Sequence, residues 1–300
     1  MNLTPNISFT EPATKFGLIS TKPALMSELL FESIRKYIYE ITGIYFQDNK
    51  KYFLESRLHR RMNFLGLKRY DEYFDLIKRG DDSTDEKQYL IEAITINETF
   101  FFRNQPQLDV LASQIFPETI TALASKNRTK IRIWSAACSS GEEAYSIAMI
   151  FQDLIKPRYP QIELEIVGTD INGAVIETAN SGIFKDYSVR NTPPYYLKKY
   201  FKSKNGSYEI LPEIKQMVNF KVHNLYDDSS MKTMYNFDVI FCANVLIYFD
   251  AASKTKVIAN LYNSLNKGGC LFIGYSETLH GISKAFKLLS FPNTVGYKKE

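Results

Sequence analysis

Three polar residues stand at or just after the ends of predicted buried strands, and their side chains could bind a nucleoside. They are Asp170, Asn224 and Asn244. A carboxylate in this position can accept hydrogen bonds from both hydroxyl groups of a ribose, and each amide can both donate and accept. Asp170 could instead cap the following helix, as Asn172 could, so the two amides at the same edge are needed to favour a nucleoside.

The turn after the first predicted strand, residues 137–143, contains serines and acids but a single glycine. It lacks the GxGxxG pattern of a dinucleotide-binding turn and the GxxxxGK[ST] pattern of a phosphate-binding loop, so dehydrogenase and nucleoside triphosphatase functions lose support. Two interpretations remain. Ser139 or Ser140 could cap the next helix, with Glu142 or Glu143 completing a capping box. Alternatively, Glu142 could bind the ammonium group of a ligand whose carboxylate lies at the helix N-terminus.

The elements that would position these residues form an α/β fold in which buried strands alternate with helices. The predicted strands span residues 131–136, 164–168, 218–222, 237–242 and 270–274. The predicted helices span residues 107–123, 141–154, 172–181 and 252–265, the last of them ending at the Asn-Lys-Gly-Gly run 266–269. Residues 286–297 are predicted to close the sheet as an antiparallel hairpin. In an open parallel sheet, ligands bind beyond the carboxyl ends of the strands, where the strand order reverses.

A smaller all-helical domain is predicted before the sheet, over residues 26–95. Its apolar residues recur every three to four positions, and Gly43 ends the first of its helices. Residues 1–25 carry three prolines and no apolar period, which predicts a disordered leader without chemistry. Residues 96–300 would then form the ligand-binding domain, with a short insertion near residues 200–217.

The composition is that of a soluble globular protein. Of its 300 residues, 45% are hydrophobic and 23% are charged, and the formal net charge is +4. These values exclude disordered, collagen-like and disulfide-scaffold classes. The three cysteines lie far apart without a zinc-binding spacing, which predicts no metal and a cytoplasmic location. The sequence shows neither a signal peptide nor the roughly 18 consecutive apolar residues of a membrane span.

Basic residues gather between Lys50 and Arg69, where seven lysines and arginines occur with one acid. Arg57, Arg60 and Arg61 are spaced three and four residues apart, so they share one face of a predicted helix. Most such charge runs are solvated surface. A basic stripe beside a cleft would alternatively hold an acidic protein helix, and nucleic acid is the runner-up partner.

Short motifs occur along the chain in a characteristic order. They are GI at 43–44, RLHRR at 57–61, NETFFFR at 97–103, WSAA at 134–137 with SGEE at 140–143, GTDI at 168–171, CANVLIYF at 242–249 and GYSE at 274–277. In this order and spacing they resemble the chemotaxis receptor methyltransferases, the CheR family. The resemblance covers about residue 26 to the end of the chain.

The resemblance implies a protein-glutamate O-methyltransferase that uses S-adenosylmethionine. It also implies a class I methyltransferase fold, with a Rossmann-like, mostly parallel sheet and a C-terminal antiparallel hairpin after the helical domain. By similarity, Asn97, Thr99 and Arg103 would close over the cofactor from the segment that joins the two domains. Asn224 and Leu225 would hold the adenosine side.

Glu142, Asp170 and Asn244 complete the implied cofactor site. Arg103 and Tyr248 are the implied catalytic residues. The guanidinium would steer the acceptor carboxylate or clamp that of the cofactor, and the tyrosine would orient the acceptor or face the sulfonium. Tyr248 could otherwise be a core aromatic. The implied substrate is an acidic cytoplasmic helix of a chemoreceptor, bound by the three arginines of the basic stripe, and a monomer without metal is expected.

The implied reaction needs no general base. A glutamate side chain has a pKa near ~4.3, so the acceptor is already an anion at neutral pH. Catalysis is then mainly positioning, because the carboxylate oxygen must be held about 3 to 3.5 Å behind the methyl carbon while water is excluded.

Two features depart from the family pattern. Ala243 stands where the family commonly has an arginine, so a second cation is missing. This favours, as an alternative, a cofactor-binding regulatory module with little turnover, and methylation of another substrate such as RNA is a further alternative. The segment 200–219 is short, with one turn at Asn205-Gly206, whereas family members that tether to a receptor's C-terminal peptide carry a longer, glycine-richer loop. The sequence therefore predicts a tether-independent member.

Overall fold

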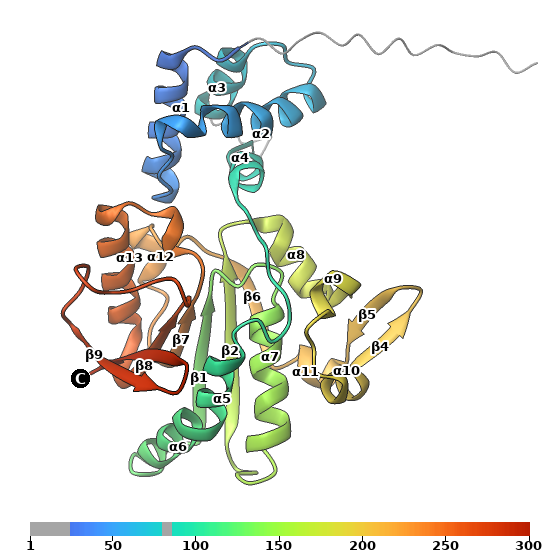
Figure 1. Ribbon diagram of the computed structural model, residues 1–300, viewed down its shortest axis with the longest axis vertical. Coiled ribbons are helices and arrows are strands. Elements are labelled where there is room, and N and C mark those ends of the chain that lie inside the picture. Colours follow the sequence, from blue (N-terminus) through green and yellow to red (C-terminus); the bar gives the residue numbers. More distant parts are fainter. Residues whose placement is uncertain (1–24, 80–85) are drawn as a thin grey trace, which may run out of the picture.

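The computed structural model describes residues 25–79 and 86–300. A group of helices lies at one end of a large sheet, and a smaller sheet lies to one side (Figure 1). The predicted leader, residues 1–25, falls outside the described residues except for Leu25. No helix within the described ranges is long and apolar enough to cross a membrane.

The helical part forms as its apolar periodicity predicts. Ser27 caps the first helix by accepting a hydrogen bond from the Leu30 amide (3.2 Å), and Gly43 ends that helix with a φ of 73°. Buried side chains from all of its helices, Phe31 and Leu54 among them, form one core. Its described elements are α1 (Glu28–Thr42), the 3-10 turn η1 (Asp48–Lys50), α2 (Lys51–Phe64), α3 (Tyr70–Arg79) and α4 (Glu86–Ile94).

The main sheet has the strand order β6-β2-β1-β7-β8-β10-β9. The strands from β6 to β8 are parallel, and β10 runs antiparallel to both β8 and β9. This confirms the predicted mostly parallel α/β sheet with a closing hairpin. Because β1 pairs with both β2 and β7, the strand order reverses between β1 and β7. The strands are β1 (Lys130–Ala136), β2 (Glu163–Asp170), β6 (Val218–Val222), β7 (Phe237–Cys242), β8 (Leu265–Ile273), β9 (Phe286–Phe291) and β10 (Thr294–Lys299).

Helices cover both faces of the main sheet, and successive strand residues contribute to the two cores in turn. Ile133 and Val239 pack into the core on the α7 side, whereas their neighbours Trp134 and Ile240 pack into the core on the α13 side. Burial on both faces makes β7 and the end of β8 mostly apolar, which is why the sequence predicts these central strands well. The first face carries α5 (Gln105–Val110), α6 (Phe116–Ala124), α7 (Glu142–Ile150), α8 (Gly173–Ser181) and the π turns η2 (Leu111–Ile115) and η3 (Phe151–Ile155); the second carries α12 (Asp228–Met231) and α13 (Ala251–Ser264).

The beginning of β8 differs from the prediction. The strand starts at Leu265, directly after α13, whereas residues 266–269 were expected to end the helix. The pairing of β8 with β7 shifts register at a bulge, and Asn266 Nδ2 donates a hydrogen bond to Asp238 Oδ1 (2.7 Å). Gly268 supplies a φ of 83°. A bulge tolerates polar and glycine residues inside a strand, so the sequence predicts the helix end to within one residue but the strand start five residues too late.

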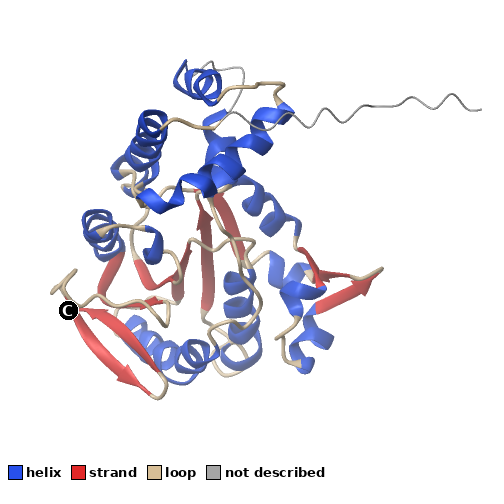
Figure 2. Cartoon of the chain, turned by 45° about the horizontal axis from the view of Figure 1, so that its top comes forward, coloured by secondary structure: helices blue, strands red, loops and turns tan. Residues whose placement is uncertain are grey.

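A separate three-stranded antiparallel sheet lies beside the main one (Figure 2). Its order is β3-β5-β4, and β4 and β5 form a hairpin whose turn, Asn205-Gly206, has positive φ at both residues. The sequence predicts this turn but not the strands, which are short and largely exposed. The elements are β3 (Ile183–Lys185), α9 (Asp186–Val189), α10 (Pro194–Tyr200), β4 (Phe201–Lys204), β5 (Ser207–Ile210) and α11 (Pro212–Lys215).

The segment after α1 pairs with the segment after β7 and so joins the helical part to the main sheet. Ile44 forms an antiparallel bridge with Phe249, and the Tyr45 amide donates a hydrogen bond to the Tyr248 carbonyl (2.9 Å). We call these two pairs the joint. Because they are main-chain contacts, they depend on the local backbone path more than on side-chain identity.

Side chains on either side reinforce the joint. Asn224 Nδ2 donates a hydrogen bond to the Ile41 carbonyl (2.7 Å), and the Tyr39 hydroxyl donates to Asp250 Oδ2 (3.2 Å). Both contacts connect α1 to loops that follow strands of the main sheet, so the orientation of the helical part is tied to the strand ends.

We expect Gly43→Ala to destabilise the protein more than Gly66→Ala. Both glycines have positive φ, 73° and 72°, so each substitution costs about 1 kcal/mol of backbone strain. A Cβ at Gly43 would lie 2.5 Å from Cδ2 of Tyr226, whereas nothing lies within 4 Å of a Cβ at Gly66. Overpacking should therefore cost Gly43→Ala a further 1–3 kcal/mol or so in the free energy of unfolding, measured by urea denaturation. Equal losses would show that Tyr226 yields at no cost.

Candidate active site

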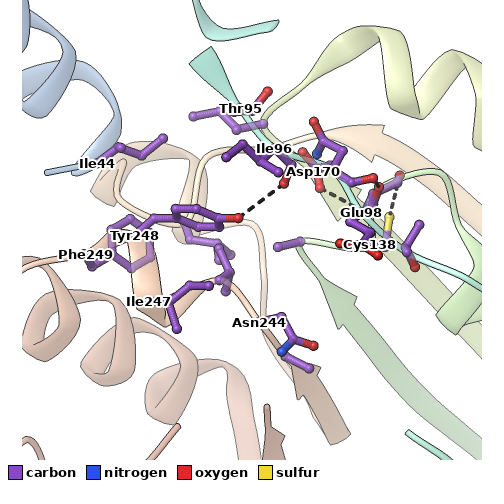
Figure 3. Close-up of a pocket in the computed structure, with 18 of the residues that line it drawn as sticks. Ile44, Thr95, Ile96, Glu98, Cys138, Asp170, Asn244, Ile247, Tyr248 and Phe249 are labelled. Carbon is purple, nitrogen blue, oxygen red and sulfur yellow. Dashed lines mark hydrogen bonds between the residues drawn. The ribbon is translucent and has the colours of Figure 1, made fainter. Parts of the chain in front are cut away.

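A cavity of about 660 Å³ lies at the carboxyl ends of β1, β2, β6 and β7, next to the helical part. It is also lined by residues 95–99 and 102–104 of the segment that runs from α4 to α5, and we call residues 95–104 the connector. Figure 3 shows Asp170 and Cys138 on one side of the cavity and Tyr248 and Phe249 on the other. This is the edge of the sheet at which the strand order reverses and at which the sequence places the ligand.

Folding brings together most of the residues that the sequence assigns to the cofactor and to catalysis. All of them except Glu142 line the cavity. They come from the connector and from the loops after β2, β6 and β7: Asn97, Thr99, Arg103, Asp170, Asn224, Leu225, Asn244 and Tyr248.

Asp170 ends β2 and is buried, with 5% of its surface exposed. Its Oδ2 accepts a hydrogen bond from the Ser139 amide (2.9 Å) and its Oδ1 from the Asn172 amide (3.0 Å). Burial raises the pKa of Asp170, and these backbone N–H groups oppose the rise. Each oxygen can accept a further hydrogen bond, which suits two ribose hydroxyls. The capping role belongs to Asn172, whose side chain accepts from the Val175 amide (3.2 Å).

The capping box that the sequence allowed at residues 139–143 does not form. α7 begins after Gly141, which has a φ of 92°, and no side chain caps it. Instead the Ser140 hydroxyl donates to the carboxylate oxygens of Glu142 (2.8 and 3.0 Å). Glu142 is fully buried and lies outside the cavity lining, and burial raises its pKa. The structure thus places Glu142 away from the space in which a ligand ammonium was expected.

Glu143, the next residue, lines the cavity. Its Oε1 accepts a hydrogen bond from the Ser135 hydroxyl (2.7 Å). Burial raises the pKa of Glu143 to about 7, although the Ser135 hydroxyl and the charge of Arg103 act in the opposite direction. Neighbouring residues on a helix point about 100° apart, so a one-residue difference decides which carboxylate meets the cavity. Nothing in the sequence separates the two glutamates.

The connector is held across the strand ends by polar contacts. Asn172 Nδ2 donates a hydrogen bond to Asn97 Oδ1 (3.0 Å), and the Ser139 hydroxyl donates to the Asn97 carbonyl (3.2 Å). The ring of Phe101 is fully buried and anchors the connector in the core of the α7 face. The other two aromatic residues differ: Phe102 is buried but also lines the cavity, and the half-buried Phe100 lies under the Arg190 guanidinium (3.8 Å to the ring centroid).

Arg103 and Tyr248 approach the cavity from the connector and from the loop after β7. Arg103 Nη1 donates to the Glu98 carbonyl (2.6 Å), which leaves its other guanidinium N–H groups for a ligand. The Tyr248 hydroxyl lies 3.5 Å from the Ile96 carbonyl, a long contact that is drawn in Figure 3. Burial raises the pKa of Tyr248, so its hydroxyl keeps its proton and can donate it to an acceptor.

Backbone strain is concentrated around the cavity. Phe102, Ala137, Ser139 and Asn244 all line it, and all have φ between 52° and 62°. Only asparagine among these residue types adopts this region readily. Strain of this kind persists where the surrounding contacts enforce it, and it is typical of sites whose backbone approaches a ligand closely.

Glu277 positions the loop after β7, a role that the sequence does not reveal. Its Oε2 accepts hydrogen bonds from the amides of Gly274 (2.6 Å) and Asn244 (3.0 Å), and its Oε1 from the Ile247 amide (3.3 Å). One carboxylate therefore links the end of β8 to the loop that lines the cavity. The GYSE motif at 274–277 marks the residue but gives no sign of these contacts.

The three arginines of the basic stripe are not equivalent. Arg61 donates two hydrogen bonds to Glu86 (2.9 and 2.8 Å), which is 3% exposed, and so joins α2 to α4. Arg57 stacks over Phe53 (5.1 Å to the ring centroid), a residue that lines the cavity, and Arg60 is exposed. Of the three arginines that the sequence predicts to bind the acceptor, Arg61 is thus held within the fold, and Arg57 and Arg60 form no ion pair with any described residue.

Metal ligands and histidines are further candidate functional groups, because both could support catalysis. Within residues 25–79 and 86–300, no group of three or more His, Cys, Asp or Glu side chains is placed to hold a metal ion. His223 lines the cavity, and burial lowers its pKa to about 4, so its ring is neutral at neutral pH.

Comparison with known proteins gives two family matches that divide the chain. The family model described as "CheR methyltransferase, SAM binding domain" matches residues 97–295, and the one described as "CheR methyltransferase, all-alpha domain" matches residues 29–95.

Individual relatives are similar over nearly their whole length. "Chemotaxis protein methyltransferase 2" of Vibrio cholerae is 38% identical, over 90% of this chain and 92% of its own. "Chemotaxis protein methyltransferase 1" of Pseudomonas aeruginosa is 33% identical, over 89% of this chain and 97% of its own. "Chemotaxis protein methyltransferase" of Borreliella burgdorferi is 35% identical, over 82% and 87%.

We expect Glu277→Gln to loosen the loop after β7, because an amide NH₂ replaces a carboxylate oxygen that faces backbone donors. The free energy of unfolding should fall by about 1–3 kcal/mol, and amide hydrogen exchange should accelerate at residues 243–248. The control is Glu118→Gln, whose carboxylate is 61% exposed and 4.0 Å from Lys298. Unchanged exchange at residues 243–248 would contradict the positioning role of Glu277.

Proposed function

The chain belongs to the CheR methyltransferase family, and on this premise we propose that it transfers a methyl group from S-adenosylmethionine to glutamate side chains of chemoreceptors. The observation that carries the proposal is a pair of carboxylates, the buried Asp170 and the part-buried Glu143, that line one cavity where the strand order reverses. A ligand that contains both a ribose and an ammonium group suits such a pair.

The side chains around the cavity fit this cofactor. The free acceptor positions of Asp170 would receive the ribose hydroxyls. We assign the ammonium group to Glu143 rather than Glu142, because only Glu143 lines the cavity. Asn224 and Leu225, after β6, would hold the adenosine side.

The connector and the loop after β7 would complete the cofactor site. Asn97 and Thr99 line the cavity from the connector, and Asn244 lines it from the opposite loop. Arg103 donates a hydrogen bond to the Glu98 carbonyl, and its remaining N–H groups would hold the carboxylate of either the cofactor or the acceptor.

Positioning supplies most of the proposed catalysis. S-adenosylmethionine, when bound, supplies a methyl group on a positively charged sulfur, and an ionised glutamate can accept it without a base. The chain would therefore have to align the acceptor carboxylate and keep water out. Tyr248 would donate its hydroxyl proton in a hydrogen bond to the acceptor, and Arg103 would restrict its approach.

The proposed partner is an acidic, glutamate-containing helix of a chemoreceptor. Arg57 and Arg60 form the part of the basic stripe that remains available on α2, and Arg57 contacts Phe53 at the cavity. Because the β4–β5 hairpin is short, with a two-residue turn, we propose that the receptor is bound without a C-terminal peptide tether.

One observation favours a second candidate function. Ala243 lines the cavity at the position where the family commonly has an arginine, so one cation is missing from the site. A cofactor-binding regulatory module with little turnover is therefore the alternative.

The deciding experiment incubates the protein with methyl-labelled S-adenosylmethionine and receptor-containing membranes. We expect base-labile methyl esters on the receptor, with Arg60→Glu lowering the initial rate without changing cofactor affinity. Arg61→Gln is the matched comparison, since it should lower stability through the loss of the Glu86 ion pair. Tight cofactor binding without transfer would favour the regulatory module, and label on RNA instead of receptor would reject the proposal.

Cofactor affinity should increase as the pH rises through about 7. Glu143 must be ionised to bind an ammonium group, and its pKa in the free protein is raised to about 7, so the ionised fraction grows about tenfold between pH 6 and pH 8. Binding should release a proton, which calorimetry in buffers of different ionisation enthalpy measures. Glu143→Gln should remove the pH dependence and Glu142→Gln should retain it. The reverse result would restore the sequence-based assignment to Glu142.

A further inference from the structure

The cavity continues beyond the strand ends, because the helical part and the start of α13 add a second region beside the joint. Tyr45 lines this region from the helical part, and Phe249 and Lys254 line it from the segment that leads into α13. Figure 3 shows Phe249 on the side opposite Asp170. We call this region the joint half and the region around Asp170 and Glu143 the cofactor half.

The two halves differ in charge. The cofactor half presents the carboxylates of Asp170 and Glu143, which suit a cationic ligand. The joint half contains two lysines, Lys50 from the helical part and Lys254 from α13, and one acid, Asp250. Asp250 keeps its negative charge while it caps α13 by accepting a hydrogen bond from an amide of the first turn (2.8 Å), so two lysines face one carboxylate in this half. The joint half therefore favours an anion.

Lys254 is the cation that α13 contributes to the joint half. It lies in the first turn of α13, is partly exposed, and forms no ion pair with any described residue. Lys256, two residues further along the same helix, pairs with Asp228 (3.1 Å) and lies 4.1 Å from the ring centroid of Tyr226. One lysine of this helix is thus used within the fold, and the other is left facing the cavity.

We propose that Lys254 binds the acidic acceptor segment where it enters the joint half, and that it thereby determines specificity for carboxylate-bearing acceptors. The inference rests on the proposed function and adds a substrate-binding residue on the sheet side of the cavity. Lys50 supplies a second charge from across the joint. Since Ala243 leaves its part of the lining uncharged, Lys254 provides a cation that the loop after β7 does not.

The chemistry of a lysine suits this role. An ammonium group is a compact charge on a flexible stem, so it attracts a carboxylate without imposing the planar geometry of a guanidinium. Charges at the edge of a binding site mainly affect encounter, affinity and salt dependence. Lys254 should therefore act on acceptor binding and leave the methyl-transfer step and cofactor binding unchanged.

The test compares Lys254→Gln, Lys254→Arg and the control Lys256→Gln in the full-length protein. Initial rates are measured with receptor-containing membranes at several salt concentrations, and binding of a soluble receptor cytoplasmic fragment is measured with S-adenosylhomocysteine present. We expect Lys254→Gln to raise the KM for receptor and the Kd for the fragment about fivefold to tenfold, with kcat and cofactor affinity unchanged and a weaker salt dependence. Lys254→Arg should largely retain both constants, and Lys256→Gln should match the wild type.

Three results would overturn the inference: an unchanged KM and Kd in Lys254→Gln, an equal effect of Lys256→Gln, or a fall in kcat at constant KM. Equal urea midpoints for the variants would show that folding is not the cause of any difference. The proposed function fails separately, if the wild-type protein labels RNA in place of receptor. If the wild-type protein labels the receptor and Lys254→Gln labels it with the same KM and Kd, only the role of Lys254 would be overturned.

Discussion

The pairing of the segment after α1 with the segment after β7 is the contact on which the site depends. Ile44 and Tyr45 pair with Phe249 and Tyr248, and all four residues line the cavity. Neither part of the molecule encloses the cavity alone, because the sheet supplies its polar strand ends and the helical part supplies its other wall. The joint therefore fixes the position of a candidate catalytic tyrosine through its main chain, and α1 and the strand ends have to fold correctly together.

The second constraint is the cost of burying charge. Asp170 and Glu143 are held in a poorly solvated site, and burial raises the pKa of both. Backbone amides stabilise Asp170 and a serine hydroxyl stabilises Glu143, but neither contact compensates fully. A ligand with ribose hydroxyls and a cationic group would supply the missing interactions. Ligand binding would therefore complete the interactions of these two carboxylates, which lower the stability of the folded protein as long as no ligand is bound.

The sequence predicts the sheet and the strand-end residues well because both follow from simple physical patterns. Buried parallel strands are continuous apolar runs, and their polar ends must meet at one edge, which places Asp170, Asn224 and Asn244 together. What it misses depends on side-chain direction and distant contacts. Glu142 and Glu143 are chemically identical neighbours, and the bonds of Glu277 join segments whose proximity is a property of the fold.

Asn224 belongs both to the contact with α1 and to the wall of the cavity. Its side-chain amide holds the Ile41 carbonyl of α1, and the residue itself lines the cavity beside Leu225. A displacement of α1 must therefore disturb the cavity wall, and a ligand that orders this wall must favour the docked position of α1. By thermodynamic reciprocity, the two effects are equal in free energy. If an acceptor helix binds to the helical part and shifts α1, it would change the affinity for the cofactor by some factor. The cofactor would then change the affinity for the acceptor helix by the same factor.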